Sequence, residues 1–258
     1  MKKFILPKNP MGGGGCYADR DALLDSGALK FAFTLAEVLI TLGIIGIVAA
    51  MTLPTIVKKY RTIVIQTQLK KIYSVVAQAM LRAAPDGDYK NLPLIKDPGG
   101  TESAKFFFDN YLKPQFKVTK TCVDKAGCWT PSIAKDGTGA SGNKGVGSGV
   151  VSFVTADGYA FSIDTWSSNH SSQVMDYFGV QSSDYAAIVA IAIDINGEKK
   201  PNVYGKDVFF YVMTERGLLP AGNDKTDDEV SQECQTIGRY CFSNVMRHNW
   251  KINEEDTF

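Results

Sequence analysis

The stretch FAFTLAEVLITLGIIGIVAAMTLPTIV, residues 31 to 57, decides how this chain is built. From Phe33 to Leu53 it is almost wholly apolar. A helix over these residues would rise by roughly 31 Å, the thickness of the hydrocarbon core of a bilayer. One carboxylate, Glu37, lies near its start. Because a charge inside a membrane span costs about 2.5–3.5 kcal/mol on insertion scales, Glu37 marks a candidate functional site in a predicted membrane-spanning helix.

The overall composition is that of a folded protein without a strong charge bias. Of the 258 residues, 45% are hydrophobic and 21% are charged, and the formal net charge is +1. A nearly neutral chain lacks the electrostatic field that favours phosphate backbones, so no nucleic-acid partner is expected. The length allows one or two domains.

Four of the five cysteines form two pairs that are close in sequence, Cys122 with Cys128 and Cys234 with Cys241. This spacing favours two short disulfide-closed loops in an oxidising compartment. Free thiols are the first alternative. A zinc site is a more distant one, because two-residue gaps between cysteines are usual there and neither histidine lies nearby in a ligand pattern.

The segment before the apolar stretch does not have the pattern of a secretory signal peptide. The apolar stretch begins late, at Phe33, and it exceeds the usual length of about 7–15 residues. No small-residue cleavage site followed by a polar mature start occurs near Ala49 and Ala50. A plain single-span anchor is the simplest interpretation. Its orientation is left open, because the charges on the two flanks are nearly balanced.

Residues 32 to 39, AFTLAEVL, resemble the prepilin cleavage and methylation motif of type IV pilins and type II secretion pseudopilins. In that family a prepilin peptidase cuts before a phenylalanine and N-methylates the new terminus, and a glutamate is the fifth residue of the mature chain. Phe33 and Glu37 have this relation. Pro54 matches the proline that commonly ends the membrane part of the family's helix. Ala32 stands where the family usually has glycine, and a leader of residues 1–32 is longer than the commonest leaders.

The resemblance implies a bacterial inner-membrane protein that is cut between Ala32 and Phe33 on the cytoplasmic side. The globular domain would be periplasmic, and the mature chain would assemble into a filament with other pilin or pseudopilin subunits. Glu37 of one subunit would then pair with the Phe33 ammonium of a neighbour, so that two charges compensate each other in apolar surroundings. The alternative for Glu37 is a carboxylate that reaches the membrane interface from the end of the helix.

Two helix-weakening residues, Gly46 and Pro54, bracket the last part of the apolar stretch. In related filaments this region stretches or melts on assembly, and small residues that ease helix–helix contact in lipid are an equally good explanation. Beyond Pro54, apolar residues recur mostly at steps of three and four, from Ile56 through Tyr60, Ile63 and Leu69 to Met80. This periodicity predicts an amphipathic continuation of the helix over residues 55–84, after the membrane part at 33–54.

Residues 85–258 are expected to form a globular domain, and Pro85 to Gly87 should end the helix before it. The predicted fold class is α+β, with the long N-terminal helix packed on a small antiparallel sheet, and the resemblance implies this pilin-like architecture too. The expected pieces are a short helix near 106–113, a flexible Gly/Ser-rich loop at 135–149, two strands flanking Asp157-Gly158, strands at 186–195 and 207–215, and a solvated acidic face at 224–233.

The turn between the last two predicted strands carries three oxygen-bearing side chains, Asp194, Asn196 and Asp207. Such side chains bind calcium in proteins, but the full EF-hand pattern is absent, so turn formation and capping are favoured over a metal. The surrounding sequence also looks like a segment common in pseudopilin-like proteins. No other cofactor is expected.

No constellation of catalytic residues is found in the sequence. His170 and His248 lie outside the nucleophile-elbow and HExxH patterns. Trp166, Tyr177 and Phe178 are candidate exposed contacts for a partner. The sequence therefore predicts a structural filament subunit, nearest to a type II secretion pseudopilin. The alternatives are a minor pilin of a surface fibre that binds DNA or a surface, and a plain membrane-anchored domain or enzyme that does not assemble.

Overall fold

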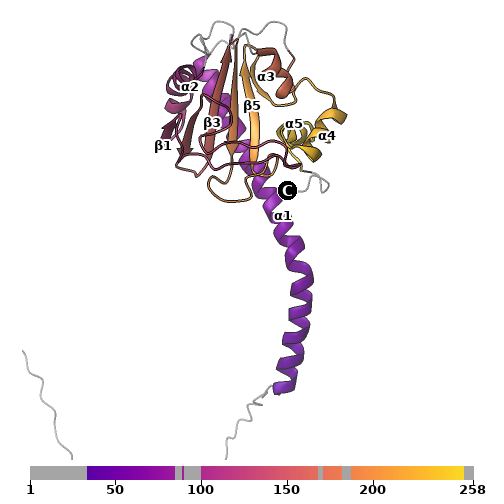
Figure 1. Ribbon diagram of the computed structural model, residues 1–258. Helices are drawn as coiled ribbons and strands as arrows, with labels where there is room; N and C mark the ends of the chain where they lie inside the picture. The colour runs from indigo at the N-terminus through magenta and orange to yellow at the C-terminus, as the bar shows by residue number, and fades with distance from the viewer. Residues whose placement is uncertain (1–33, 85–88, 90–99, 168–170, 182–186, 253–258) are drawn as a thin grey trace, which may run out of the picture. The chain divides into compact units, whose positions relative to one another are not determined.

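The structure, a computed structural model, describes residues 34–84, 89, 100–167, 171–181 and 187–252 (Figure 1). The chain divides into two compact units, residues 1–51 and 52–258. The predicted leader, with Ala32 and the methylation residue Phe33, lies outside the described residues, as do Pro85 to Gly87 and His170.

A single long helix, α1, runs from Leu35 to Ala83 and contains Pro54. Within the described part of the chain it is the one helix that is long and apolar enough to cross a membrane. The boundary between the two units falls between Met51 and Thr52. The part of α1 that follows Thr52 therefore belongs to the same compact unit as the rest of the globular fold.

The second unit is built on a six-stranded antiparallel sheet whose strands are neighbours in chain order (Figure 1). This confirms the α+β class. The strands predicted on both sides of Asp157-Gly158, at 186–195 and at 207–215 are present, and Gly158 takes a φ of 86° in the first hairpin turn, which glycine adopts without strain. The strands are β1 (Val118–Val123), β2 (Val151–Thr155), β3 (Ala160–Ser167), β4 (Ala187–Asp194), β5 (Val208–Thr214) and β6 (Gly217–Pro220).

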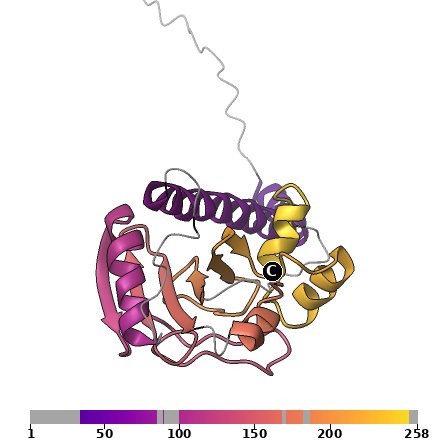
Figure 2. The ribbon, with the colours of Figure 1, turned by 90° about the horizontal axis from the view of Figure 1, so that it is seen from above.

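One face of the sheet is covered by the C-terminal part of α1 together with α2 (Thr101–Phe107) and α5 (Cys241–Arg247). Figure 2 shows this part of α1 running along the sheet, and Tyr73 of α1 packs against Phe242 of α5 with ring centroids 5.9 Å apart. The α1 residues that this face buries are Leu69, Ile72, Val76, Ala79 and Met80.

The predicted amphipathic face of α1 is correct in its C-terminal half and wrong in its N-terminal half. Ile56, Tyr60 and Ile63 have exposed fractions of 60%, 68% and 59%. Burial against the sheet begins only near Ile65 and becomes complete at Leu69. The apolar periodicity therefore continues over about two turns that none of the described elements of the globular unit covers.

The opposite face of the sheet is also buried, which the sequence did not predict. In β4, Val189, Ile191 and Ile193 join the core beside α1, while the intervening residues join a second core. That second core is closed by α3 (Ser171–Tyr177) and α4 (Asp227–Thr236), and Figure 2 shows α3 on the side of the strands away from α1. Because both faces are buried, β4 and β5 have continuous apolar sequences instead of an alternation.

Several predicted segments differ in extent from the observed elements. The helix expected near 106–113 begins earlier, as α2 at Thr101, and continues as a π-helical turn (Phe108–Leu112) and a 3₁₀ turn (Lys113–Gln115). The acidic stretch at 224–233 is not a solvated face throughout, because most of α4 lies in it and its last residue, Glu233, is half-buried in an ion pair. Strands β1 and β6 and helices α3 and α5 were not predicted.

The Gly/Ser-rich loop at 135–149 is held in place by polar side chains of the sheet. Val146 N donates to Ser162 Oγ over 2.8 Å, and Ser148 N donates to Asp164 Oδ2 over 2.9 Å. Burial raises the pKa of the Asp164 carboxyl, and these backbone donors oppose the rise. The loop expected to be flexible thus has a path fixed by hydrogen bonds.

Candidate functional site

The Glu37 carboxylate caps its own helix in this structure. Glu37 Oε2 accepts hydrogen bonds from both Thr34 N and Thr34 Oγ1 at 2.9 Å, and Glu37 N donates to Thr34 Oγ1 over 3.2 Å. This reciprocal pattern is a capping box, in which a Thr at the start of a helix and a Glu three residues later satisfy each other's free donors. The T-x-x-E pattern of residues 34–37 is the signal in the sequence that predicts this cap. Glu37 therefore has a local role beside the predicted intermolecular one.

The first half of α1 presents apolar side chains around its whole circumference. Exposed fractions of the large apolar residues between Leu35 and Leu53 range from 43% at Val38 to 80% at Leu35. A Cβ placed on Gly43 or Gly46 would meet no atom within 4 Å, so both glycines lie on open surface. A surface of this kind is stable only in lipid or against other apolar helices.

The predicted calcium ligands Asp194, Asn196 and Asp207 come together at one end of the sheet, where the chain leaves β4 and returns to β5. Asp194 Oδ1 accepts from Asn196 N at 3.0 Å and from Gly197 N at 2.9 Å. Asp207 accepts from Asn202 N and Val203 N, both at 2.7 Å, and Asn196 Nδ2 donates to Asp207 Oδ2 over 2.9 Å. These carboxylates therefore stabilise the turn through backbone hydrogen bonds, and turn formation is the role that the sequence favoured over calcium binding.

The second oxygen of Asp194 faces the amide of Asn202. With the amide nitrogen turned toward it, Asn202 donates to Asp194 Oδ2 over 3.2 Å and to Lys199 O over 2.8 Å. Burial raises the pKa of Asp194 to about 7, and the negative charge of Asp207 adds to the rise. If Asp194 Oδ2 carried a proton, it would instead donate that proton to the amide oxygen of Asn202, turned toward it. The amide orientation and the protonation of Asp194 are therefore coupled.

The carboxylates of this turn are too few for a metal centre by themselves. Among the described residues, no group of three or more His, Cys, Asp or Glu side chains could hold a metal ion. Asn196 Oδ1 is a buried oxygen without a hydrogen-bond partner among the residues described. Calcium in this turn stays a prediction.

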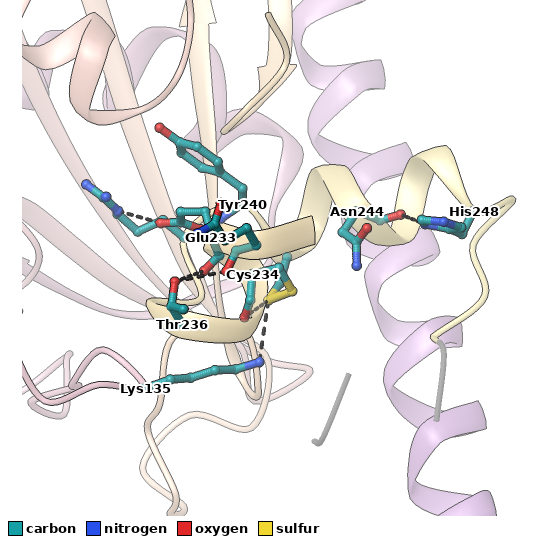
Figure 3. Close-up of a disulfide and its surroundings, with 10 residues drawn as sticks. Lys135, Glu233, Cys234, Thr236, Tyr240, Asn244 and His248 are labelled. Atoms are coloured by element: carbon teal, nitrogen blue, oxygen red, sulfur yellow. Dashed lines mark hydrogen bonds and ion pairs between the residues drawn. A yellow bond between two sulfur atoms is a disulfide. The ribbon is translucent and has the colours of Figure 1, made fainter. Parts of the chain in front are cut away.

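Both short-range cysteine pairs favoured by the sequence are disulfides. Cys122 in β1 is bonded to Cys128, and Cys234 in α4 is bonded to Cys241 at the start of α5. Figure 3 shows the second disulfide, with Lys135 Nζ 3.7 Å from Cys241 Sγ.

A half-buried ion pair between Glu233 and Arg239 stands beside the second disulfide. Glu233 Oε1 accepts from Arg239 Nε at 2.8 Å, and Glu233 Oε2 accepts from Tyr240 N at 2.7 Å. Burial raises the pKa of Glu233, and the Arg239 guanidinium, which also stacks 4.1 Å from the centre of the Tyr177 ring, opposes that rise. The disulfide and the ion pair together fix the α4–α5 corner.

The three aromatic residues proposed as partner contacts have different environments. Phe178 is 2% exposed and belongs to the second core, so its predicted exposure is wrong. Trp166 is half-buried against the same core. Tyr177 is exposed, although its ring is covered on one face by Arg239.

No family model, curated protein or solved structure matches this chain.

Proposed function

We propose that this chain is a structural subunit of a type IV pilin-like filament, of the type II secretion pseudopilin kind. Prepilin peptidase would cut the precursor between Ala32 and Phe33 and methylate Phe33. The observation that carries the proposal is the motif at 32–39 at the start of a long helix whose apolar side chains are exposed from Leu35 to Leu53.

The exposed first half of α1 supports a helix that passes from lipid into a filament. Removing a large aliphatic side chain from water lowers the free energy by about 1.5–3 kcal/mol. Exposing the ten or so large apolar residues of this segment to water would therefore raise the free energy by an amount on the order of 15 kcal/mol. Such a helix cannot leave the membrane alone. Neighbouring subunits that offer the same apolar surface would replace the lipid.

The two disulfides support a periplasmic location for the globular unit. Disulfides form and persist in oxidising compartments, and the bacterial periplasm is one. The leader would then stay in the cytoplasm, and the protein would cross the inner membrane once. The proposed work of the protein is structural and associative, without a catalytic step of its own.

Mass spectrometry of the mature N-terminus tests the proposal. The expected product begins with N-methylated Phe33. A membrane-bound chain that keeps residues 1–32 would overturn the assignment and leave a plain single-span anchor.

A pair of substitutions separates the two roles of Glu37. Glutamine can replace glutamate in a capping box, so Glu37→Gln keeps the cap with Thr34 and removes the charge, while Glu37→Ala removes both. Cross-linking of processed subunits in membranes should drop strongly for both variants if Glu37 pairs with the Phe33 ammonium. Normal assembly of Glu37→Gln, with a defect only in Glu37→Ala, would show that Glu37 acts as a cap alone.

A further inference from the structure

An apolar groove with a basic rim lies between α1 and the turn that connects β4 to β5. Its cavity volume is about 420 Å³. The apolar part of its wall includes Val57, Tyr60, Val64, Ile65, Ile195 and Pro201. All of these residues belong to the globular unit that begins at Thr52. The groove includes the two turns of α1 that the sheet leaves uncovered.

Four basic side chains line the groove, Lys58 and Arg61 from α1 and Lys200 and Lys206 from the turn. None of the four forms an ion pair with any described residue. One acidic residue, Asp207, also lines the groove, but its two oxygens accept three N–H donors from the turn. Like charges around one concave surface repel each other and raise the local concentration of anions, so the groove is suited to a negatively charged group.

The position of the groove along the chain indicates that the negatively charged group lies in the headgroup layer of the membrane. Lys58 and Arg61 follow Leu53, the last residue of the predicted span, by five and eight residues. In a helix these steps correspond to about 8 and 12 Å. The headgroup layer of a bilayer extends roughly 5–8 Å beyond each side of the hydrocarbon core, so these two side chains start at or just beyond it and can reach back into it.

We propose that this groove binds an anionic phospholipid, with the phosphate among Lys58, Arg61, Lys200 and Lys206 and an acyl chain on the apolar wall. The inference rests on the proposed membrane span. A headgroup phosphate supplies the charge that the four cations lack, and the acyl chain supplies the apolar contact that Tyr60 and Val57 lack. The bound lipid would tie the turn between β4 and β5 to the start of the uncovered part of α1.

Native mass spectrometry of the full-length chain in dodecyl maltoside tests the proposal. Dioleoylphosphatidylglycerol and dioleoylphosphatidylcholine are added in turn, and the fraction of chains with one bound lipid gives each affinity. Phosphatidylglycerol should bind at least tenfold more tightly, and its affinity should fall with added salt. Each basic residue near an anionic lipid surface raises the affinity about fivefold. Removal of two charges in Lys200→Gln with Lys206→Gln should therefore weaken binding roughly 30-fold.

Two further variants make the result specific. Lys58→Gln with Arg61→Gln removes two charges from the other wall and should have the same effect. Lys117→Gln with Lys125→Gln removes two exposed charges away from the groove and should leave binding unchanged. Near-ultraviolet circular dichroism checks that every variant is folded.

Three outcomes would overturn the proposal. They are equal affinity for the two lipids, equal losses in the groove and control variants, and a dimer whose formation displaces the lipid, which would assign the groove to a second copy of the chain. Alkaline extraction of membranes separates a failure of the lipid site from a failure of the membrane span on which the proposed function depends. A chain that is retained by the membrane without lipid preference refutes the lipid site alone, whereas a chain released by carbonate refutes the span.

Discussion

Replacing Asp194 by asparagine should make the stability of the globular unit less dependent on pH. The Asp194 side chain is fully buried, and burial raises the pKa of its carboxyl to about 7. The variant keeps the oxygen that accepts from Asn196 N and Gly197 N. Its new Nδ2 takes the place of Oδ2 beside the Asn202 amide, so the shape of the turn is preserved without a charge.

The sign and size of the effect follow from the two pKa values. In the unfolded chain an aspartate has a pKa of about 3.9. Between about pH 4 and pH 7 the folded protein therefore binds a proton that the unfolded chain has lost, and the free energy of unfolding falls as the pH rises. Over about three pH units, at about 1.36 kcal/mol each, the loss amounts to about 4 kcal/mol. The stability that Asp194 contributes is present below pH 4 and is lost as the pH passes 7.

Urea unfolding of the oxidised full-length chain in detergent, followed by tryptophan fluorescence from pH 4 to pH 8, measures this directly. Asp194→Asn should match the wild type near pH 4 and exceed its stability at pH 8 by up to about 4 kcal/mol. Asp124→Asn, at an exposed carboxylate that pairs with Lys144, controls for the removal of one negative charge. Parallel curves for Asp194→Asn and the wild type would refute the buried, protonated carboxyl.

The remaining predictions concern the same turn, the core and a disulfide. Millimolar calcium should leave the melting temperature unchanged, because the oxygens of Asp194 and Asp207 already accept backbone donors; an increase of several degrees would establish a calcium site. Phe153→Ala should lower the free energy of unfolding by about 3–5 kcal/mol in urea titrations, since Phe153 is fully buried and stacks on a neighbouring ring at 4.6 Å. Replacing Cys234 and Cys241 by serine should lower it by about 2–3 kcal/mol, and unchanged unfolding would show that this bond does not constrain the unfolded chain.

The parts of the fold that the sequence predicts well are those with a strong apolar signal. The helix α1 follows from its length and periodicity, and β2 to β5 follow from apolar runs bounded by turns such as Asp157-Gly158. Strand β6 is not predicted from the sequence because it has only four residues. Helix α4 is not predicted either, because its sequence is polar and only Val230 and Cys234 are buried. Neither element buries enough apolar surface to leave a periodic pattern.

The electrostatics of the candidate site depends on contacts that a linear sequence does not specify. Glu233 lies among acidic residues and looks solvated, but its partner Arg239 is six residues away, beyond the end of α4. Arg239 reaches Glu233 because the chain turns back directly after α4, where Gly238 has a φ of 98°. Asp194 and Asp207 are thirteen residues apart and meet because the turn between β4 and β5 folds back on itself. Their burial, which decides their protonation, is a property of that fold.

The uncovered turns of α1 show why an amphipathic pattern does not identify what the apolar face contacts. Ile56, Tyr60 and Ile63 continue the spacing of the buried residues, yet the sheet begins to cover the helix only beyond them. Lys58 and Arg61 alternate with them on the same turns. An apolar stripe of this kind has the same period whether it meets a sheet, lipid or a neighbouring subunit. With basic residues interleaved directly after an apolar span, the pattern is that of a helix at a membrane interface, where aliphatic side chains enter the acyl boundary and lysine and arginine reach the phosphates.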